Sequence, residues 1–396
     1  MRRIIIFVLS VLFATSSICA QGNYNASSPG GKRELKELLS EKFNNLAEKK
    51  SLTLKGGIKY EGGAKGKKPN GCGKALYPNG DNYFGEFVRG ERHGLGIYTY
   101  KDGERYEGSF LNDRQHGQGT FYFNDGKRYE GTWQLDYQHG YGRMVYPNGD
   151  YYVGMWNEDK RNGTGSYVYA NGASYSGEWK DDKYNGVGTF VWSDNSKYVG
   201  SWKNGRRDGD GVFYYSNGDI YRGGWQNGMR HGQGEYIYTA DSCKYSGGFA
   251  SGVWQGYGVY SDVAGIIYEG NFSEGKRNGH GKMNYENGAV YDGEWKNNER
   301  HGKGKYTWAN GDVYEGEWSN DTMNGTGVLR LANGMKYRGG FLNGEEHGTG
   351  VAVDTDGMRY EGTFEGGMRH GKFIVKDSTG KVIRECIYNL GTISNK

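Results

Sequence analysis

The chain has 396 residues and a formal net charge of +4, with 72 Gly and 35 Tyr but only 4 Pro. Abundant glycine with few aliphatic residues excludes a set of ordinary globular domains. The glycines recur at fixed distances from large aromatic residues, which a flexible linker would not require, so the composition indicates a repeat protein.

Residues 1–20 have the features of a cleaved secretory signal peptide. Arg2 and Arg3 supply a positive start, residues 4–14 form an apolar run too short to span a bilayer, and Ala20 is a small residue before the expected cleavage point. We therefore expect an exported protein that is periplasmic, envelope-associated or secreted. Lipidation of Cys19 and an uncut anchor are the alternatives, although the residues before Cys19 match a lipoprotein signal poorly.

Residues 21–58 are predicted to form a linker and one short amphipathic helix, because apolar residues recur at helical spacing between Lys32 and Lys50. Residues 32–68 carry eleven Lys and Arg against five Glu, which makes this region a candidate contact for an anionic membrane surface. A solvated helix face that caps the repeats is the alternative. The candidate contact residues are Lys32, Arg33, Lys36, Lys42, Lys49, Lys50, Lys55, Lys65, Lys67 and Lys68.

A 23-residue repeat starts at Tyr60 and occurs fourteen times, with a single 24-residue step between Tyr221 and Tyr245. We number positions from each repeat tyrosine, which is position 0. Glycine occupies positions 2 and 11 in every repeat, and position 13 in all but the last, which has Phe373. Trp or Phe occupies position 4 except in the first repeat, which has Ala64. Such self-similarity predicts units that pack on their neighbours.

Alternation within each repeat predicts two β-strands. In residues 129–133 the aromatic residues and glycine share one face, which leaves room for a ring to lie across the glycine backbone. A second strand over residues 140–146 leads to Asn148 and Gly149, and ten repeats carry Asn-Gly or Asp-Gly here, the pair preferred in type I′ turns. We therefore predict an all-β fold, an elongated single-layer twisted antiparallel meander over residues 59–372, with residues 373–396 as a capping hairpin and tail.

This pattern, Tyr-x-Gly-x-Trp/Phe followed by spaced glycines, an aromatic residue and Asn-Gly, resembles the MORN-repeat family. The resemblance covers about four fifths of the chain and implies an elongated twisted sheet of hairpins. It also implies roles in scaffolding, membrane attachment and phospholipid binding. In some members the repeats accompany a lipid kinase or lysine methyltransferase domain, for which this chain has no room.

No group of residues predicts catalysis, a metal site or a cofactor. Seven of the eight histidines share position 10 with Asn, Asp and Gln of other repeats, so we interpret them as turn residues. Neighbouring repeats would hold them about 10 Å apart, too far to share a zinc ion. On a rod, Cys72, Cys243 and Cys386 are too distant to pair, so free thiols are favoured over an intermolecular link.

The aromatic face is the candidate binding surface. A non-enzymatic exported scaffold that binds an extended protein partner is the leading hypothesis. Phospholipid binding through the basic N-terminal region and binding of envelope polysaccharide are the alternatives; nucleic acid is not expected, because the repeats lack a basic stripe. The candidate binding residues are Tyr106, Trp133, Tyr152, Trp156, Tyr175, Trp179, Tyr198, Trp202, Tyr221, Trp225, Trp295 and Trp318.

Overall fold

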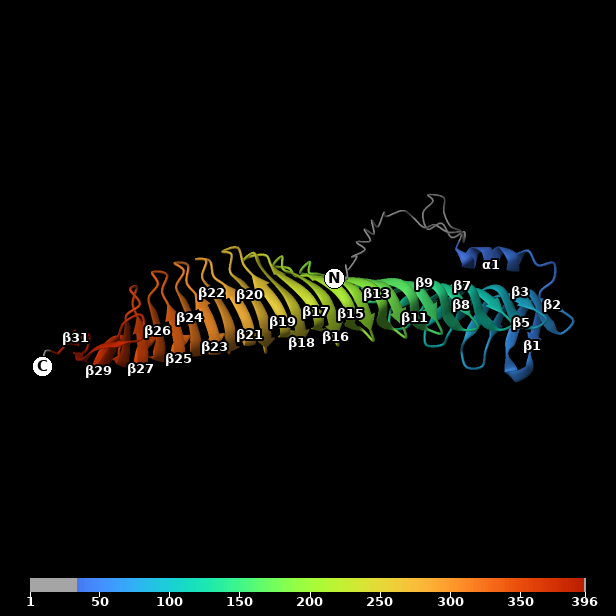
Figure 1. The fold of residues 1–396 in the computed structure, drawn as a ribbon. Helices are drawn as coiled ribbons and strands as arrows, with labels where there is room; N and C mark the ends of the chain where they lie inside the picture. The colour runs from blue at the N-terminus through green and yellow to red at the C-terminus, as the bar shows by residue number, and fades with distance from the viewer. Residues whose placement is uncertain (1–33, 395–396) are drawn as a thin grey trace.

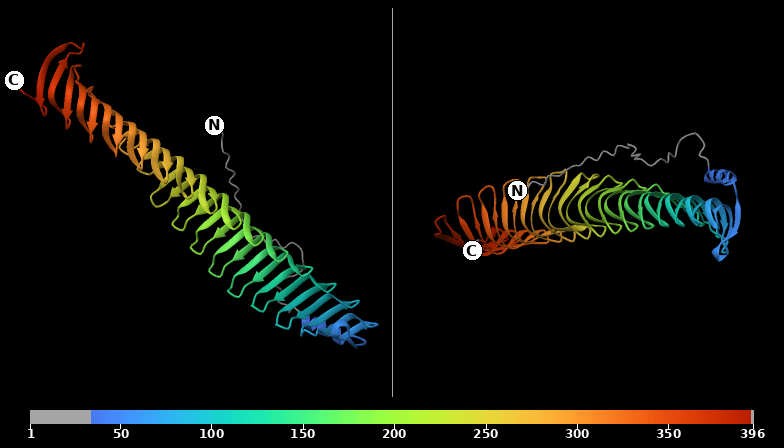
Figure 2. Two further views of the ribbon diagram at one scale, coloured as in Figure 1. Left: turned by 90° about the horizontal axis from the view of Figure 1, so that it is seen from below. Right: turned by 90° about the vertical axis from the view of Figure 1, so that its right-hand side faces the viewer.

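The computed structural model describes residues 34–394, which form one α-helix, one 3-10 turn and a single sheet of 31 strands. Each strand pairs antiparallel with the next one along the chain, from β1 and β2 to β30 and β31. Figure 1 shows the result as a long twisted ribbon, and Figure 2 shows the same ribbon from two further sides. The predicted all-β meander of hairpins is confirmed.

Fourteen hairpins build the ribbon, each with a shorter and a longer strand. The first strands are β2 (Lys59–Lys65), β4 (Asn82–Val88), β6 (Arg105–Leu111), β8 (Arg128–Gln134), β10 (Tyr151–Asn157), β12 (Ser174–Lys180), β14 (Lys197–Lys203), β16 (Ile220–Gln226), β18 (Cys243–Ala250), β20 (Ile267–Ser273), β22 (Val290–Lys296), β24 (Val313–Ser319), β26 (Lys336–Leu342) and β28 (Arg359–Glu365). The second strands are β3 (Lys68–Leu76), β5 (Glu91–Thr99), β7 (Arg114–Tyr122), β9 (Tyr137–Val145), β11 (Lys160–Val168), β13 (Lys183–Val191), β15 (Arg206–Tyr214), β17 (Met229–Tyr238), β19 (Val253–Ser261), β21 (Lys276–Asn284), β23 (Glu299–Thr307), β25 (Thr322–Arg330), β27 (Glu345–Val353) and β29 (Met368–Lys376).

The N-terminal end is closed by α1 (Leu35–Asn44), β1 (Lys50–Thr53) and the 3-10 turn η1 (Lys55–Gly57). The amphipathic helix is confirmed but is shorter than the predicted pattern, because the chain turns back to form β1, a strand the sequence did not predict. The apolar side of α1 packs on the face of the sheet opposite the repeat tyrosines, where Leu39 and Phe43 are buried with Cys72.

The repeat tyrosine lies across the backbone of its own hairpin. In the sixth repeat, a Cβ atom added to Gly188 would lie 2.3 Å from the hydroxyl of Tyr175, and one added to Gly177 would lie 2.5 Å from the Cα of Gly188. The tyrosine hydroxyl donates to the carbonyl of Glu178 over 2.8 Å. The ring thus covers two facing glycines, and the predicted packing is confirmed.

Edge-to-face contacts join these tyrosines into a continuous chain of rings. Trp179 contacts Tyr175 of its own repeat at 5.3 Å and Tyr152 of the preceding repeat at 5.2 Å between ring centroids. The same alternation runs from Tyr60 to Tyr388. We call these rings the inner ring chain; they stand at positions 0 and 4, and Phe373 and Tyr388 complete the chain in the last repeat. It is the core of a protein that has only one layer of secondary structure.

The type I′ turns lie within the hairpins, not at the Asn-Gly pair for which they were predicted. In the turns within hairpins, at positions 6 and 7, both residues have positive φ in every hairpin but the first, as at Asn112 (49°) and Asp113 (68°), which is the requirement of a type I′ turn. Between hairpins, Gly149 has positive φ but Asn148 does not, and the amide of Gly149 donates to the carbonyl of Tyr146 over 3.0 Å. This is the pattern of a type I turn followed by a left-handed glycine, which also suits Asn-Gly.

Position 10 lies inside the second strand rather than in a turn, which corrects the interpretation of the histidines. In β5 the residue with positive φ is Gly94 (65°), next to His93. The pairing with β4 shifts there: Gly85 faces Gly96, but Phe87 faces Arg92. This β-bulge recurs in every hairpin from β2–β3 to β28–β29 and bends the longer strand.

The C-terminal end is closed by β30 (Val382–Asn389) and β31 (Thr392–Ile393). The predicted final hairpin is present, with β29 as its first strand. Phe373, which replaces the glycine at position 13, is fully buried, and its own ring covers Gly362. Tyr360 is displaced, and its hydroxyl donates to Asp354 over 3.1 Å.

Candidate binding groove

A row of partly exposed side chains follows the face of the sheet that carries the inner ring chain, and part of this surface is hollowed. Its lining comes from positions 4, 9, 15 and 17, with the turn residue at position 7 on its rim. Between Tyr100 of the second repeat and Asp182 of the sixth it holds a hollow of about 660 Å³, lined among others by Phe123, Tyr146 and Gln138. We call this surface the aromatic groove.

The twelve aromatic residues predicted to bind a partner all belong to the inner ring chain. Their exposed fractions range from 0% at Tyr106 to 7% at Trp202. They therefore form the floor beneath the groove, and contact between these rings and a partner stays a prediction.

A second chain of rings, from positions 15 and 17, borders the open groove. Its position-17 rings are half-buried, whereas some position-15 rings, such as Phe213 and Tyr236, are buried. Tyr167 and Tyr169 lie 4.5 Å apart between centroids, and Tyr169 and Phe190 lie 6.0 Å apart. Tilted contacts continue this chain through Trp192 and on to Tyr238. We call it the groove ring chain. The sequence did carry a signal for it, since ten repeats have an aromatic residue at position 17, just ahead of the turn.

Arginine at position 9 lies between the two ring chains. The guanidinium of Arg161 lies 4.5 Å from the Trp179 ring of the inner chain and 5.4 Å from the Tyr167 ring of the groove chain. Position 9 is arginine in seven repeats, and the others carry Pro, Gln, Tyr, Trp, Met or Glu. The sequence alone did not mark position 9 as part of a binding surface, because its residue type varies from repeat to repeat.

Neighbouring repeats are joined at the rim through position 7. Asp182 accepts from the amide of Arg161 at 3.1 Å and from its Nε at 2.8 Å. The same arrangement joins Arg92 to Asp113. Each aspartate belongs to the turn of one hairpin and bonds to an arginine of the preceding hairpin. These charged pairs therefore align consecutive hairpins along the groove.

Burial raises the pKa of the repeat tyrosines, to about 12 for Tyr198 and Tyr268. Their hydroxyls therefore stay protonated and donate to backbone carbonyls, as Tyr198 does to Ser201 over 3.0 Å. Burial also raises the pKa of the Glu346 carboxyl, at position 9 near the C-terminal end, to about 7, although the Arg369 charge opposes this rise.

The repeat model for MORN matches this chain fourteen times in succession between residues 60 and 372. The chain belongs to the MORN-repeat family. In this protein each MORN repeat is thus a hairpin whose tyrosine lies across paired glycines, beneath the aromatic groove.

Solved structures similar to this MORN-repeat chain include a TCP10 domain of CPAP from Danio rerio, at 14% identity over 50% of this chain and 99% of that one, with a TM-score of 0.27. A TCP domain of SAS-4 from Drosophila melanogaster, in complex with a proline-rich motif of Ana2, is 14% identical over 45% and 84%, with a TM-score of 0.24. A virginiamycin B lyase from Staphylococcus aureus is 10% identical over 85% and 97%, with a TM-score of 0.13. Scores this low carry no functional argument. No curated protein matches the chain.

The predicted membrane-contact residues come from several elements at the N-terminal end. Lys36 and Lys42 lie on α1, Lys50 on β1 and Lys65 at the end of β2. Except for the half-buried Lys50, those in the described range are exposed, and Lys42 forms an ion pair with Glu86. Residues 1–20, Lys32 and Arg33 lie outside the described residues. Within that range no helix has the length and apolar character needed to cross a bilayer.

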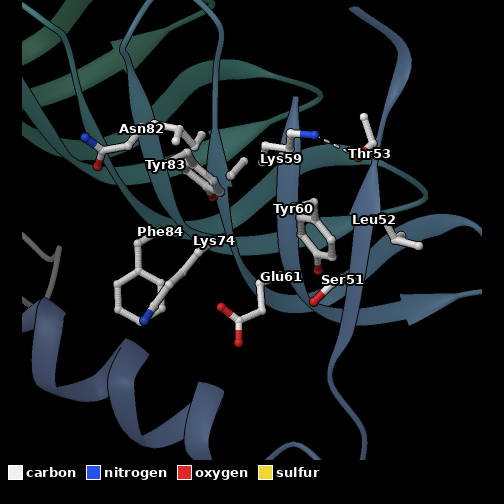
Figure 3. Close-up of a pocket in the computed structure, with 12 residues that line it drawn as sticks. Ser51, Leu52, Thr53, Lys59, Tyr60, Glu61, Lys74, Asn82, Tyr83 and Phe84 are labelled. Carbon is white, nitrogen blue, oxygen red and sulfur yellow. Dashed lines mark hydrogen bonds between the residues drawn. The ribbon is translucent and has the colours of Figure 1, made fainter. Parts of the chain in front are cut away.

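A second hollow, of about 630 Å³, lies at the N-terminal end between β1 and β4. Figure 3 shows Tyr60, Glu61 and Lys74 around it, with Lys59 donating to Thr53 over 3.3 Å. Its lining residues come from the end strands and are not repeated along the rod. This hollow therefore does not offer a site that an extended partner would meet in successive repeats.

The three cysteines of the described chain are free and far apart in the strand order. Cys72 is buried beneath α1, whereas Cys243 and Cys386 are half-buried. Burial raises the pKa of Cys72 to about 11, so this thiol is protonated near neutral pH. Over residues 34–394, no group of three or more His, Cys, Asp or Glu is placed to hold a metal ion.

Proposed function

We propose that this MORN-repeat protein is a non-catalytic scaffold that holds an extended polypeptide in its aromatic groove. The observation that carries the proposal is the groove ring chain, whose Tyr, Phe and Trp rings follow one another across successive repeats and are half-buried at position 17. Aromatic rings give a large contact area at low entropic cost, and a groove that repeats along a rod suits an extended partner.

Peptide selection tests this proposal. Peptides selected for binding to the full chain from a random library would be measured against two variants. Tyr169→Ser with Tyr215→Ser removes two half-buried rings from the groove, and Tyr141→Ser with Tyr257→Ser removes two exposed rings from the opposite face. We expect the groove variant to weaken binding about tenfold or more and the control to leave it unchanged. The reverse result would place the binding surface on the other face.

We further propose that the protein is exported, since residues 1–20 have the pattern of a secretory signal. Sequencing the N-terminus of the protein from its source cells tests this. A mature chain that starts at Gln21 supports export, and a chain that starts at Met1 contradicts it.

A membrane role is the second candidate, favoured by the exposed lysines at the N-terminal end. Vesicles of anionic and of neutral lipid would be sedimented with the full chain at low and high salt. Sedimentation that requires anionic lipid and is lost after Lys65→Gln, Lys67→Gln and Lys68→Gln supports this role. If the chain stays in solution with both lipids, the membrane hypothesis is wrong.

A further inference from the structure

Six of the seven position-9 arginines of the aromatic groove fall into two kinds, and the seventh, Arg369, lies in the last repeat and donates to the Tyr388 hydroxyl over 3.3 Å. Arg92, Arg161 and Arg300 each form an ion pair with the aspartate at position 7 of the next repeat, at distances of 2.8 to 3.2 Å. Arg207, Arg230 and Arg277 lack this partner, because Gly228, Gly252 and Asn298 stand at that place. Within residues 34–394, none of these three arginines has a carboxylate at ion-pair distance.

The unpaired guanidiniums keep the same position over the rings. Arg207 lies 4.1 Å from the centroid of Trp225, and Arg277 lies 4.4 Å from that of Trp295. Arg207 donates to the carbonyl of Gly228 over 2.9 Å through one Nη atom, and the donors that the paired arginines direct to aspartate have no carboxylate here. Desolvation lowers the pKa of both Arg207 and Arg277. A partly buried cation without a counter-charge attracts an anion, and the planar guanidinium fits a carboxylate in particular.

We propose that the central part of the aromatic groove, from Arg207 to Arg277, binds an acidic extended peptide whose carboxylates replace the missing aspartates. This inference rests on the proposed function, since it names the chemistry of the polypeptide held in the groove.

The spacing of the arginines favours a polypeptide with acidic residues at every third place. Two strands per repeat set Arg207 and Arg230, in adjacent repeats, about 10 Å apart along the rod. Trp254 holds position 9 of the repeat between Arg230 and Arg277, so these two arginines lie about 20 Å apart, or two such steps. A polyproline II helix advances about 9 Å in three residues and then presents the same side again. A fully extended strand repeats its face after about 7 Å and would soon lose register with the arginines.

The aspartates at position 7 of other repeats suggest a variant, called the filled variant, in which carboxylates of the chain itself pair with the three arginines. Gly228→Asp, Gly252→Asp and Asn298→Asp together introduce the carboxylates that other repeats already carry at position 7. A Cβ atom at Gly228 or Gly252 meets no heavy atom within 4 Å. Both glycines have φ of 88°, and aspartate is found with positive φ in equivalent turns, as at Asp136 (76°). The variant is therefore expected to fold.

The matched control is Asn204→Asp, Asn227→Asp and Asn297→Asp. It adds the same three negative charges at position 6, one residue earlier in such turns, where these side chains are exposed. Thermal melts by circular dichroism would verify that both variants remain folded.

The probe is a labelled peptide of Glu-Pro-Pro triplets long enough to cover this part of the groove, with a Gln-Pro-Pro peptide as its neutral twin. We expect the Glu peptide to bind in a salt-dependent manner and to bind the filled variant about tenfold or more weakly, with the control near the unmodified chain. Equal losses in both variants, or no loss in the filled one, would overturn the inference.

Oligogalacturonate, an acidic polysaccharide, tests whether the anion bound by these arginines is a glycan instead of a peptide. If it binds through the same arginines and the Glu peptide does not, the acidic ligand is a glycan and the peptide assignment is wrong. If neither anion binds while library-selected peptides still require Tyr169 and Tyr215, the charge inference fails and the proposed scaffold function stands.

Discussion

The inner ring chain and the groove ring chain run side by side along one face of the sheet, but they differ in geometry and exposure. Inner rings meet edge to face and are buried, as with Trp179 at 4% exposure. Groove rings such as Trp192 meet at tilts near 40° and stay half-buried. The difference indicates that the inner rings hold the hairpins together, whereas the groove rings at position 17 remain partly exposed.

The largest expected effect comes from removing one tryptophan of the inner ring chain, compared with one tryptophan of the groove ring chain. Trp179→Ala removes two edge-to-face contacts and the indole bond to the carbonyl of Gly165, so we expect a local loss of about 4 kcal/mol. Trp192→Ala in the groove ring chain should cost about 1 kcal/mol, because its ring is only half-buried. Hydrogen exchange of the strands from β11 to β15 measures both, since long repeat arrays do not unfold as one unit. Equal losses would contradict the division between the chains.

A smaller effect tests the paired glycines that lie beneath the tyrosines of the inner ring chain. Gly188→Ala places a Cβ atom 2.3 Å from the Tyr175 hydroxyl, and displacing that ring should cost about 2 to 3 kcal/mol. Gly205→Asn is the control, because nothing lies within 4 Å of its Cβ position and Asn298 occupies the equivalent turn place. Hydrogen exchange that shows the strands of the alanine variant as protected as those of the control would contradict the close approach.

A pH-dependent effect is expected in the groove. Burial raises the folded-state pKa of Glu346 to about 7, above its unfolded value of 4.5. The protonated form is therefore favoured by folding, and this contribution is lost as the pH rises from 4.5 through 7. Glu346→Gln should raise the melting temperature by about 2 °C at pH 8 and leave it unchanged at pH 4. The same gain at both pH values would show that the carboxyl charge is not the cause.

The smallest effect concerns the acidic residues between hairpins. Asp150 accepts bonds from the amide of Ala170 at 2.8 Å and from the Tyr167 hydroxyl at 2.7 Å, and these bonds lower its pKa. Its stabilising contribution is present above the unfolded pKa and lost as the pH falls through the lower folded value. Asp150→Asn should therefore lower the melting temperature by about 1 °C at pH 6, and the difference should vanish at strongly acidic pH. If the melting temperature of the variant stays lower at strongly acidic pH, the cause is altered packing and not the carboxylate charge.

Much of the fold could be predicted from residue spacing. The repeat tyrosines, the glycines at positions 2 and 13 and the period of two along residues 129–133 specify paired strands with rings across glycine. The turn types were assigned wrongly because Asn-Gly suits both a type I′ turn and a type I turn with a left-handed glycine. The turns at positions 6 and 7 vary in sequence, as with Leu135 and Asp136, so their shared type I′ geometry did not show in the residue types.

The sequence by itself determined the number of hairpins, their order and the residues that share each face, because side-chain direction along a strand follows from a period of two. Only the tertiary structure decided which aromatic rows are buried. The structure places positions 9, 15 and 17 around the hollow above the inner rings, and a β-bulge beside Gly94 and its equivalents sets position 9 opposite position 4. The structure also decided that Phe373 takes the place of the last repeat tyrosine, since one ring suffices to cover the glycine and the strand that carries it can change.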